Sequence, residues 1–286
     1  MPDMSANDAV LRTVGLTKRY ADFWGRPGPA ALDRLDLDVQ PGEVFGLLGP
    51  NGSGKTTTIK LLLGLLRPSA GDAFVFGRSP DDPAVKARIG YLPEETYLYR
   101  FLTADETLRF FGGIFRLPAA TIRSRSDELI ALVGLSGARR RRLGEYSKGM
   151  ARRLGLAQAL INDPALVILD EPTSGLDPLG AVEVKELILR LKAAGKTVLL
   201  CSHLLADVEE VCDRIAILHQ GTLIERGSVA DLLRDDTRMQ VELDTADPAV
   251  LDAVKAAAGA HLRSVGPPRE RLEARFRSLI AKARQR

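Results

Sequence analysis

The apolar residues of this chain fall into two kinds of run, and each kind predicts a different strand environment. Leu32 to Val39 alternates apolar with mostly acidic residues, the period of a strand with one buried face, and Pro41-Gly42 follows as a turn. Three later runs are continuously apolar, as in strands covered on both faces: 44–48, 165–169 and 197–201. We therefore expect an antiparallel sheet near the N-terminus and a mostly parallel sheet after it.

Helical periodicity separates these runs, which places the chain in the α/β class. One helix is expected over Thr57 to Leu66 and another over Gly180 to Ala194, between two buried strands that would then run parallel. Ala104 to Leu160 has helical spacing, broken at Pro118 and at 134–137, and is expected to form a helical insertion.

The remaining segments predict smaller elements. Ala73 to Phe76 is expected to form a strand, and Arg214 to Glu225 a hairpin that turns at Gln220-Gly221. A short helix is expected from Ser228. From about residue 235 the chain changes character, which predicts a small C-terminal appendage over 235–286. Its expected elements are a strand over 239–243, a helix over 248–258 and a basic helix over 269–286.

Composition narrows the class of protein. The chain has 286 residues, 45% of them hydrophobic, so it can bury a substantial core. Cys201 and Cys212 lack the spacing of a metal site or a disulfide framework, which favours a reducing cytosol. The sequence shows neither a secretory signal nor an apolar run near the roughly 18 residues of a membrane span. A net charge of +3 is too small to indicate a nucleic-acid partner.

Residues Gly49 to Thr56 read GPNGSGKT and join the strand expected over 44–48 to the next helix. Backbone N–H groups in such a loop converge on phosphate oxygens, and the helix N-terminus adds partial positive charge. Lys55 adds a full charge, and Thr56 offers a hydroxyl to Mg²⁺. An ordinary glycine-rich turn is the weaker alternative, because strand and helix flank the motif as a phosphate site requires. The chain is therefore expected to bind a nucleoside triphosphate in a P-loop NTPase core.

A triphosphatase also needs a group that holds Mg²⁺ and a group that activates water. Asp170 and Glu171 directly follow the apolar run 165–169. Because neighbouring side chains of a strand point to opposite sides, Asp170 can face the metal while Glu171 faces the water. Such a pair also fits a solvated acidic turn, but its combination with the lysine loop indicates hydrolysis.

Further motifs resemble the ATP-binding cassette of ABC transporters. Tyr146 to Met150 (YSKGM) stands where that family has its signature, and Ser174 to Asp177 (SGLD) resembles the loop that crosses between paired cassettes. His203 resembles the switch histidine, and Tyr20 stands where the family stacks an aromatic ring on adenine. The resemblance covers roughly residues 9–234 and implies a helical subdomain at about 95–160.

The resemblance implies a role for each motif residue. Lys55, Glu171 and His203 would act in catalysis, and the metal ligands would be Thr56, Asp170 and Glu94. The nucleotide would be bound by Tyr20, Gly49, Pro50, Asn51, Gly52, Ser53, Gly54, Lys55, Thr56, Thr57, Glu94, Ser147, Gly149 and Asp177.

Several of these positions also allow structural interpretations. Ser147 resembles a helix N-cap, so it either presents N–H groups to a phosphate on another subunit or simply caps its helix. His203 would reach the γ-phosphate or the attacking water, and lies near Glu171 if their two strands are neighbours. Tyr20 would stack on the purine, although Phe23 and Trp24 compete for that role and packing is an alternative.

The chain departs from the family pattern at two motifs. Glu94 stands where the family usually has glutamine; a carboxylate can bind Mg²⁺ but cannot donate a hydrogen bond as an amide does, and Glu95 is a second candidate. In the signature, Lys148 adds a positive charge and Met150 replaces an amide. We interpret both departures as subfamily features, similar to cassettes of ABC-2 type exporters, rather than as lost activity.

The resemblance implies an ATPase, with ATP and Mg²⁺ as cofactors, that works as a cassette dimer with a second copy or a paralogue. It would drive a separate transmembrane permease, with export as the expected direction, from the cytoplasmic face of the inner (plasma) membrane. The alternative is an ATPase of the same family acting on ribosomes or DNA, but such proteins usually carry two cassettes, a coiled-coil insertion or zinc-binding cysteines. No nucleic-acid partner is expected.

The segment Thr96 to Thr103 (TYLYRFLT) concentrates aromatic and aliphatic residues just after Glu94. In a chain with 5% aromatic residues, such a concentration indicates either a surface that receives a partner helix or packing inside the helical insertion.

Overall fold

The computed structural model describes residues 9–21, 23–24, 26–234, 245 and 247–259. The elements expected over 239–243 and 269–286 lie outside these residues. The chain divides into two compact units, Met1–Leu232 and Leu233–Arg286. In the second unit the described residues form α9 (Pro248–Ala258), where a helix was expected.

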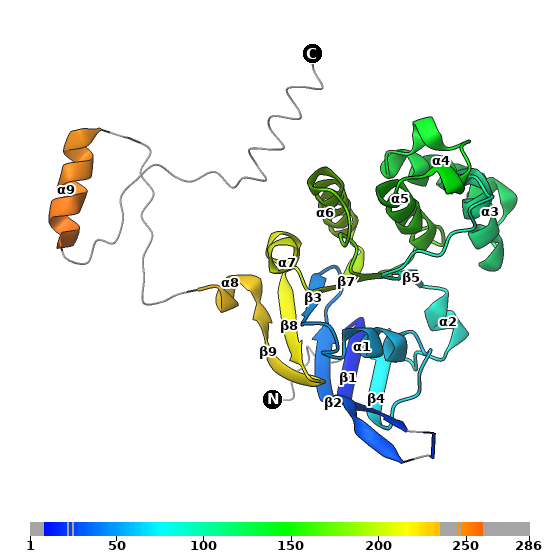
Figure 1. Ribbon diagram of the computed structural model, residues 1–286, viewed down its shortest axis with the longest axis horizontal. Coiled ribbons are helices and arrows are strands. Elements are labelled where there is room, and N and C mark those ends of the chain that lie inside the picture. The colour runs from blue at the N-terminus through cyan, green and yellow to red at the C-terminus, as the bar shows by residue number, and fades with distance from the viewer. Residues whose placement is uncertain (1–8, 22, 25, 235–244, 246, 260–286) are drawn as a thin grey trace. The chain divides into compact units, whose positions relative to one another are not determined.

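The first unit contains two sheets (Figure 1). The smaller is antiparallel, in the order β2-β1-β4, and consists of β1 (Leu11–Ala21), β2 (Pro27–Val39) and β4 (Ala70–Val75). The larger has the order β5-β6-β7-β3-β8-β9 and is parallel except for the β8-β9 hairpin. Its strands are β3 (Val44–Leu48), β5 (Ile89–Leu92), β6 (Leu166–Asp170), β7 (Thr197–Ser202), β8 (Arg214–His219) and β9 (Thr222–Ser228).

Eight described α-helices accompany these sheets in the first unit: α1 (Lys55–Leu62), α2 (Pro83–Lys86), α3 (Ala104–Ile114), α4 (Ala119–Leu132), α5 (Lys148–Ala159), α6 (Pro178–Ala193), α7 (Leu205–Val211) and α8 (Val229–Leu232). Helices α3, α4 and α5 gather in one lobe, the expected helical insertion (Figure 1). Among the helices that the structure describes, none is both long enough and apolar enough to cross a membrane.

The larger sheet separates two hydrophobic cores, because successive side chains of its central strands point to opposite faces. Val44 and Leu48 of β3 join the core formed with α3 to α7, which we call the lobe core. Phe45 and Leu47 join the core formed with α1 and the smaller sheet, which we call the nucleotide-side core. Burial on both faces explains why these strands are continuously apolar in sequence.

Helix α1 begins and ends earlier than its sequence predicts. Gly54, with φ 108°, is its N-cap, so Lys55 is already helical. Gly64, with φ 63°, ends the helix: its N–H bonds to Leu61 O, and the N–H of Leu65 bonds to Lys60 O. This is the Schellman pattern, in which a left-handed glycine closes a helix and leaves the next leucine outside it.

Other boundaries moved by one to five residues, the largest shift being β2, which begins at Pro27 and not at Leu32. Some elements have no counterpart in the sequence-based expectations. Strand β4 ends at Val75 because Phe76 adopts φ 53°, and β6 extends to Asp170, which pairs with Cys201. Strand β5 was missed because its four residues include a glycine and give no clear period. Strand β1 and helix α7 were also not located from the sequence.

Candidate active site

The loop from Gly49 to Thr56 connects β3 to α1 and depends on glycine at two points. A Cβ on Gly54 would lie 2.8 Å from Ala31 O, and one on Gly49 would collide with Leu218 O. Both residues also have positive φ, at 108° and 156°. The loop can therefore lie against β2 and β8 only with these side chains missing. The N–H of Ser53 bonds within the loop to Pro50 O at 3.1 Å, and successive backbone N–H groups of such a loop can bind an anion.

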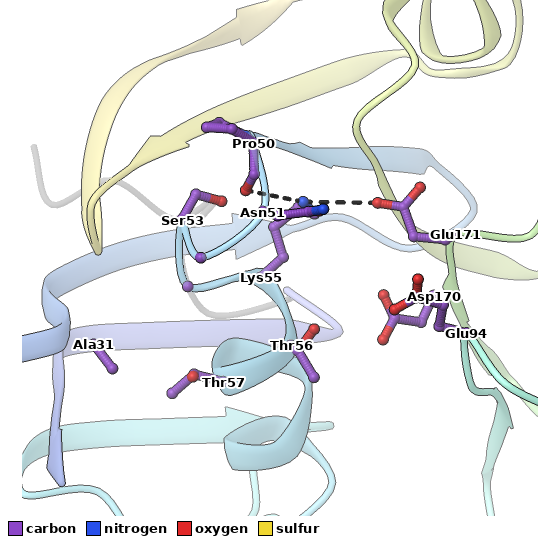
Figure 2. Close-up of a pocket in the computed structure, with 12 residues that line it drawn as sticks. Ala31, Pro50, Asn51, Ser53, Lys55, Thr56, Thr57, Glu94, Asp170 and Glu171 are labelled. Atoms are coloured by element: carbon purple, nitrogen blue, oxygen red, sulfur yellow. Dashed lines mark hydrogen bonds and ion pairs between the residues drawn. The ribbon is translucent and has the colours of Figure 1, made fainter. Parts of the chain in front are cut away.

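This loop forms one wall of a cavity of about 390 Å³ (Figure 2). The opposite wall carries three carboxylates, Glu94, Asp170 and Glu171. The complete lining is Ala31, Pro50, Asn51, Gly52, Ser53, Gly54, Lys55, Thr56, Thr57, Glu94, Asp170 and Glu171. A lysine, two threonine hydroxyls and free loop amides thus face acidic groups across a space large enough for a polyphosphate.

Asp170 and Glu171 both line this cavity, although strand alternation predicts opposite directions for them. Asp170 is the last residue of β6, whereas Glu171 lies beyond it with φ 49°. The N–H of Glu171 still bonds to Cys201 O of β7 at 2.9 Å. The left-handed turn breaks the alternation, so two consecutive carboxylates reach the same space.

Lys55 bridges the loop and the acidic wall. Its Nζ donates to Gly49 O at 2.5 Å and to Pro50 O at 3.3 Å, and lies 3.7 Å from Glu171 Oε1 (Figure 2). Lys55 and Glu171 are both buried, so this attraction is screened less than it would be at the surface. The ammonium group is therefore held at the point where loop and acids converge.

His203 contacts Glu171 from outside the cavity lining. It follows the end of β7, which pairs directly with β6, so the two residues lie at the same edge of the sheet. Its Nδ1 lies 2.8 Å from Glu171 Oε2, and its backbone N–H points to the same oxygen at 3.4 Å. Its side chain is 45% exposed, so the ring remains accessible to a ligand.

The acidic wall carries concentrated negative charge. Burial, together with the nearby carboxylates of Glu94 and Glu171, raises the pKa of Asp170 to about 6, against the opposing charges of Lys55 and Arg152. A cation bound in the cavity would relieve this repulsion. Carboxylate and hydroxyl oxygens from Asp170, Glu94 and Thr56 are the ligand type that Mg²⁺ prefers.

Other predicted site residues lie beside the cavity or away from it. Tyr20 is half exposed, and its hydroxyl lies 3.5 Å from Thr57 Oγ1, next to the lining. Ser147 and Asp177 are exposed N-caps of α5 and α6, accepting from Met150 N and Gly180 N. Gly149 lies on α5 next to Ser147, and within the described part of the chain none of these three lines the cavity.

Arg152 is a site residue that the sequence-based reasoning missed. It lies on α5, is 5% exposed, and donates hydrogen bonds to the backbone of both Asp170 and Glu171. The available signal was helical spacing: Leu156 and Ala159, four and seven residues after Arg152, are buried on the same face of α5. A charged residue among buried helical positions indicates a specific partner.

A glycine-rich strand-loop-helix that faces paired carboxylates at the end of parallel strands defines a P-loop nucleoside triphosphatase. Residues 32–174 match the family model described as ABC transporter. An uncharacterized ABC transporter ATP-binding protein of Nostoc sp. is 49% identical over 246 residues, which cover 85% of this chain and 73% of that protein. The fluoroquinolones export ATP-binding protein of Mycobacterium tuberculosis is 41% identical over 237 residues, 82% of this chain and 76% of that protein.

A solved structure of an ATP-binding subunit of an ABC transporter superposes with a TM-score of 0.69 at 32% identity, covering 78% of this chain and 91% of that one. The chain belongs to the ABC transporter family, as an ATP-binding subunit with ATPase function. The family, the α/β fold class and the ATPase predicted from the sequence are thereby confirmed.

Proposed function

We propose that the cavity binds Mg²⁺-ATP with the division of roles given by its geometry. Lys55 and the loop amides hold the β- and γ-phosphates, while Thr56, Asp170 and Glu94 hold the metal. Bound Mg²⁺ would neutralise charge on the phosphates. The observation that carries this proposal is that Glu171 contacts both Lys55 and His203. Its Oε1 lies 3.7 Å from Lys55 Nζ, and its Oε2 lies 2.8 Å from His203 Nδ1.

Glu171 orients the attacking water in this proposal. One of its oxygens faces Lys55 and the other His203, so its carboxylate plane is fixed from two sides. Phosphoryl transfer depends on positioning and charge stabilisation more than on covalent chemistry, so a fixed carboxylate beside the γ-phosphate position supplies what the reaction needs.

A second cassette completes the site. Ser147 and Lys148 are exposed, Gly149 is half-buried, and all three lie away from the chain's own cavity, so the N–H groups at the start of α5 can meet a nucleotide held by another cassette. Asp177 is exposed on the next helix of the chain. The head-to-tail arrangement of the family uses both segments across the interface, with a second copy or a paralogue as the partner.

The membrane partner is proposed to dock on the helical lobe. Tyr97, Tyr99 and Phe101 are 82%, 51% and 66% exposed, while Leu98 of the same segment packs against the lobe core. Tyr99 also contacts Phe110 of α3, with ring centroids 5.8 Å apart. This aromatic surface, Tyr97, Tyr99, Phe101 and Phe110, is suited to an amphipathic helix of a separate permease. The chain would then act at the cytoplasmic face of the membrane, and the export relatives favour export.

The Glu171→Gln variant tests the assignment of the catalytic carboxylate. It should lose ATP turnover at least about 100-fold while forming an ATP-dependent dimer, because nucleotide binding stays intact and reopening requires hydrolysis. Phosphate release and size-exclusion chromatography with ATP measure both effects. Rapid hydrolysis by this variant would show that another group activates the water.

Affinity purification of the tagged chain from detergent-solubilised membranes tests the partner. A polytopic membrane protein recovered in stoichiometric amount supports the permease proposal. Recovery of ribosomes or DNA would favour the alternative function instead. The confirmed transporter-subunit family favours the first outcome.

A further inference from the structure

One buried side chain on α5, that of Arg152, connects two segments of the active site. The Nη1 group of Arg152 donates to Pro93 O, to Glu94 O at 2.8 Å and to Thr96 Oγ1 at 3.1 Å. Its Nη2 group donates to Asp170 O at 2.5 Å and to Glu171 O at 2.8 Å, and Nε donates to Pro172 O at 3.1 Å. The loop after β5 and the end of β6 are therefore fixed to one guanidinium.

We propose that Arg152 is a positioning residue for ATP hydrolysis: it sets the backbone of Glu94, Asp170 and Glu171 relative to one another and couples their placement to helix α5. Every bond goes to a backbone carbonyl or a hydroxyl, so the guanidinium fixes the main chain and leaves the three carboxylates free to face the cavity. Only arginine offers five N–H donors in a rigid planar fork.

Arg152 keeps its positive charge although it is buried. Burial lowers the pKa of Arg152 to about 10, and the carboxylates of Asp170, Glu94 and Glu171 act in the opposite direction. Arg152 therefore stays protonated at neutral pH and offsets part of the charge of the acidic wall.

Helix α5 also connects Arg152 to the proposed dimer interface, and this step rests on the proposed function. Ser147 caps α5, and Arg152 lies just over one helical turn further along the same helix. A displacement of the helix N-terminus on contact with the partner cassette's nucleotide would be passed to the carboxylates through the six bonds of Arg152. Misplacement of such groups by about 1 Å lowers rates about 100-fold.

The Arg152→Met variant tests the proposal, because methionine fills similar space without any donor. Arg125→Met is the matched control: Arg125 also donates to backbone carbonyls, of Leu160 and Ile161, but beyond the other end of α5. For both variants we would measure kcat, thermal unfolding, binding of a fluorescent ATP analogue in EDTA, and Mn²⁺ binding with ADP by electron paramagnetic resonance.

We expect Arg152→Met to lower kcat about 30- to 100-fold and Mn²⁺ affinity about tenfold. The affinity for the ATP analogue in EDTA should change less than about threefold, because the phosphate-binding loop is not altered. Arg152→Lys, with three donors for six acceptors, should be intermediate. Arg125→Met should keep wild-type kcat and Mn²⁺ affinity.

Equal losses of kcat in Arg152→Met and Arg125→Met at equal loss of thermal stability would overturn the proposal, since Arg152 would then only support the fold. Equal weakening of metal-free nucleotide binding and kcat would overturn it as well. Should Arg152→Met not fold, wild-type kcat and Mn²⁺ affinity in Arg152→Lys would decide against the proposal. A wild-type chain that does not hydrolyse ATP would refute the proposed function instead, independently of Arg152.

Discussion

Nδ1 of His203 lies 2.8 Å from Oε2 of Glu171, although 32 residues separate them in the sequence. The contact exists because β6 and β7 are adjacent and parallel, so the residues that follow them meet at one edge of the sheet. The hydrogen bond holds the Glu171 carboxylate in place for the proposed mechanism. The His203 ring stays partly exposed, so a nucleotide could still reach it.

Replacing His203 should therefore impair hydrolysis without impairing nucleotide binding. We expect His203→Ala to lower kcat about 100-fold, in the range that a positioned acid or base contributes, with nucleotide affinity nearly unchanged. His203→Gln should retain more activity than His203→Ala, because its amide can still donate to Glu171. Steady-state kinetics and equilibrium binding measure the two effects, and equal activity in all three proteins would contradict the assigned role.

The raised pKa of Asp170 predicts that the stability of the folded chain depends on pH. Its folded-state pKa is raised from 3.8 to about 6, so between these values the folded chain holds a proton that the unfolded chain has released. The contribution of Asp170 to stability therefore falls as pH rises through this window and stays low above pH 6.

Asp170→Asn should remove this penalty. We expect the nucleotide-free variant to be more stable than the wild type at pH 7.5 by about 1–3 kcal/mol, with a smaller difference at pH 5, while Mg²⁺-dependent hydrolysis is lost. Urea unfolding at both pH values measures the difference. A variant less stable than the wild type at pH 7.5 would show that the charged carboxylate supports the fold.

Glu94 should increase the affinity of the site for its metal. Replacing it with glutamine removes one negative charge from the cavity wall, so we expect the Mg²⁺ concentration for half-maximal hydrolysis to rise about three- to tenfold. Glu95→Gln is the matched control, because Glu95 accepts from Tyr97 OH and is not among the described residues that line the cavity. A larger effect from Glu95 would transfer the proposed role to that residue.

The aromatic surface should serve the permease and not the ATPase reaction. We expect a Tyr97→Ser, Phe101→Ser double variant to lose co-purification with its membrane partner while the isolated cassette hydrolyses ATP at the wild-type rate. Ile224→Ser is the control, since Ile224 is 61% exposed on β9, outside the helical lobe. Undiminished co-purification of the double variant would place the docking surface elsewhere.

Much of this arrangement could be predicted because its signals are local. Continuous apolar runs indicate β3, β6 and β7, and the glycine spacing of the loop indicates phosphate binding. The two motifs together predict one hydrolytic site, and the distance of 3.7 Å between Lys55 Nζ and Glu171 Oε1 comes from the structure alone.

The remaining features depend on tertiary contacts that no local pattern encodes. Strand β5 is short and takes its conformation from pairing with β6. The left-handed backbone of Glu171 is set by neighbouring segments, and glutamate has no intrinsic preference for it. The role of Arg152 depends on carbonyls from two separate segments, the loop after β5 and the end of β6, which become neighbours of α5 only on folding.

Because the larger sheet has a separate core on each face, a substitution in one core does not need to disturb the packing of the other. Val167 and Ile168 are adjacent in β6, yet the first packs into the lobe core and the second into the nucleotide-side core. If a membrane partner docks on the lobe as proposed, substitutions on the lobe side of the sheet can alter that contact while the nucleotide side stays constant. One ATPase site could in this way be combined with different membrane partners.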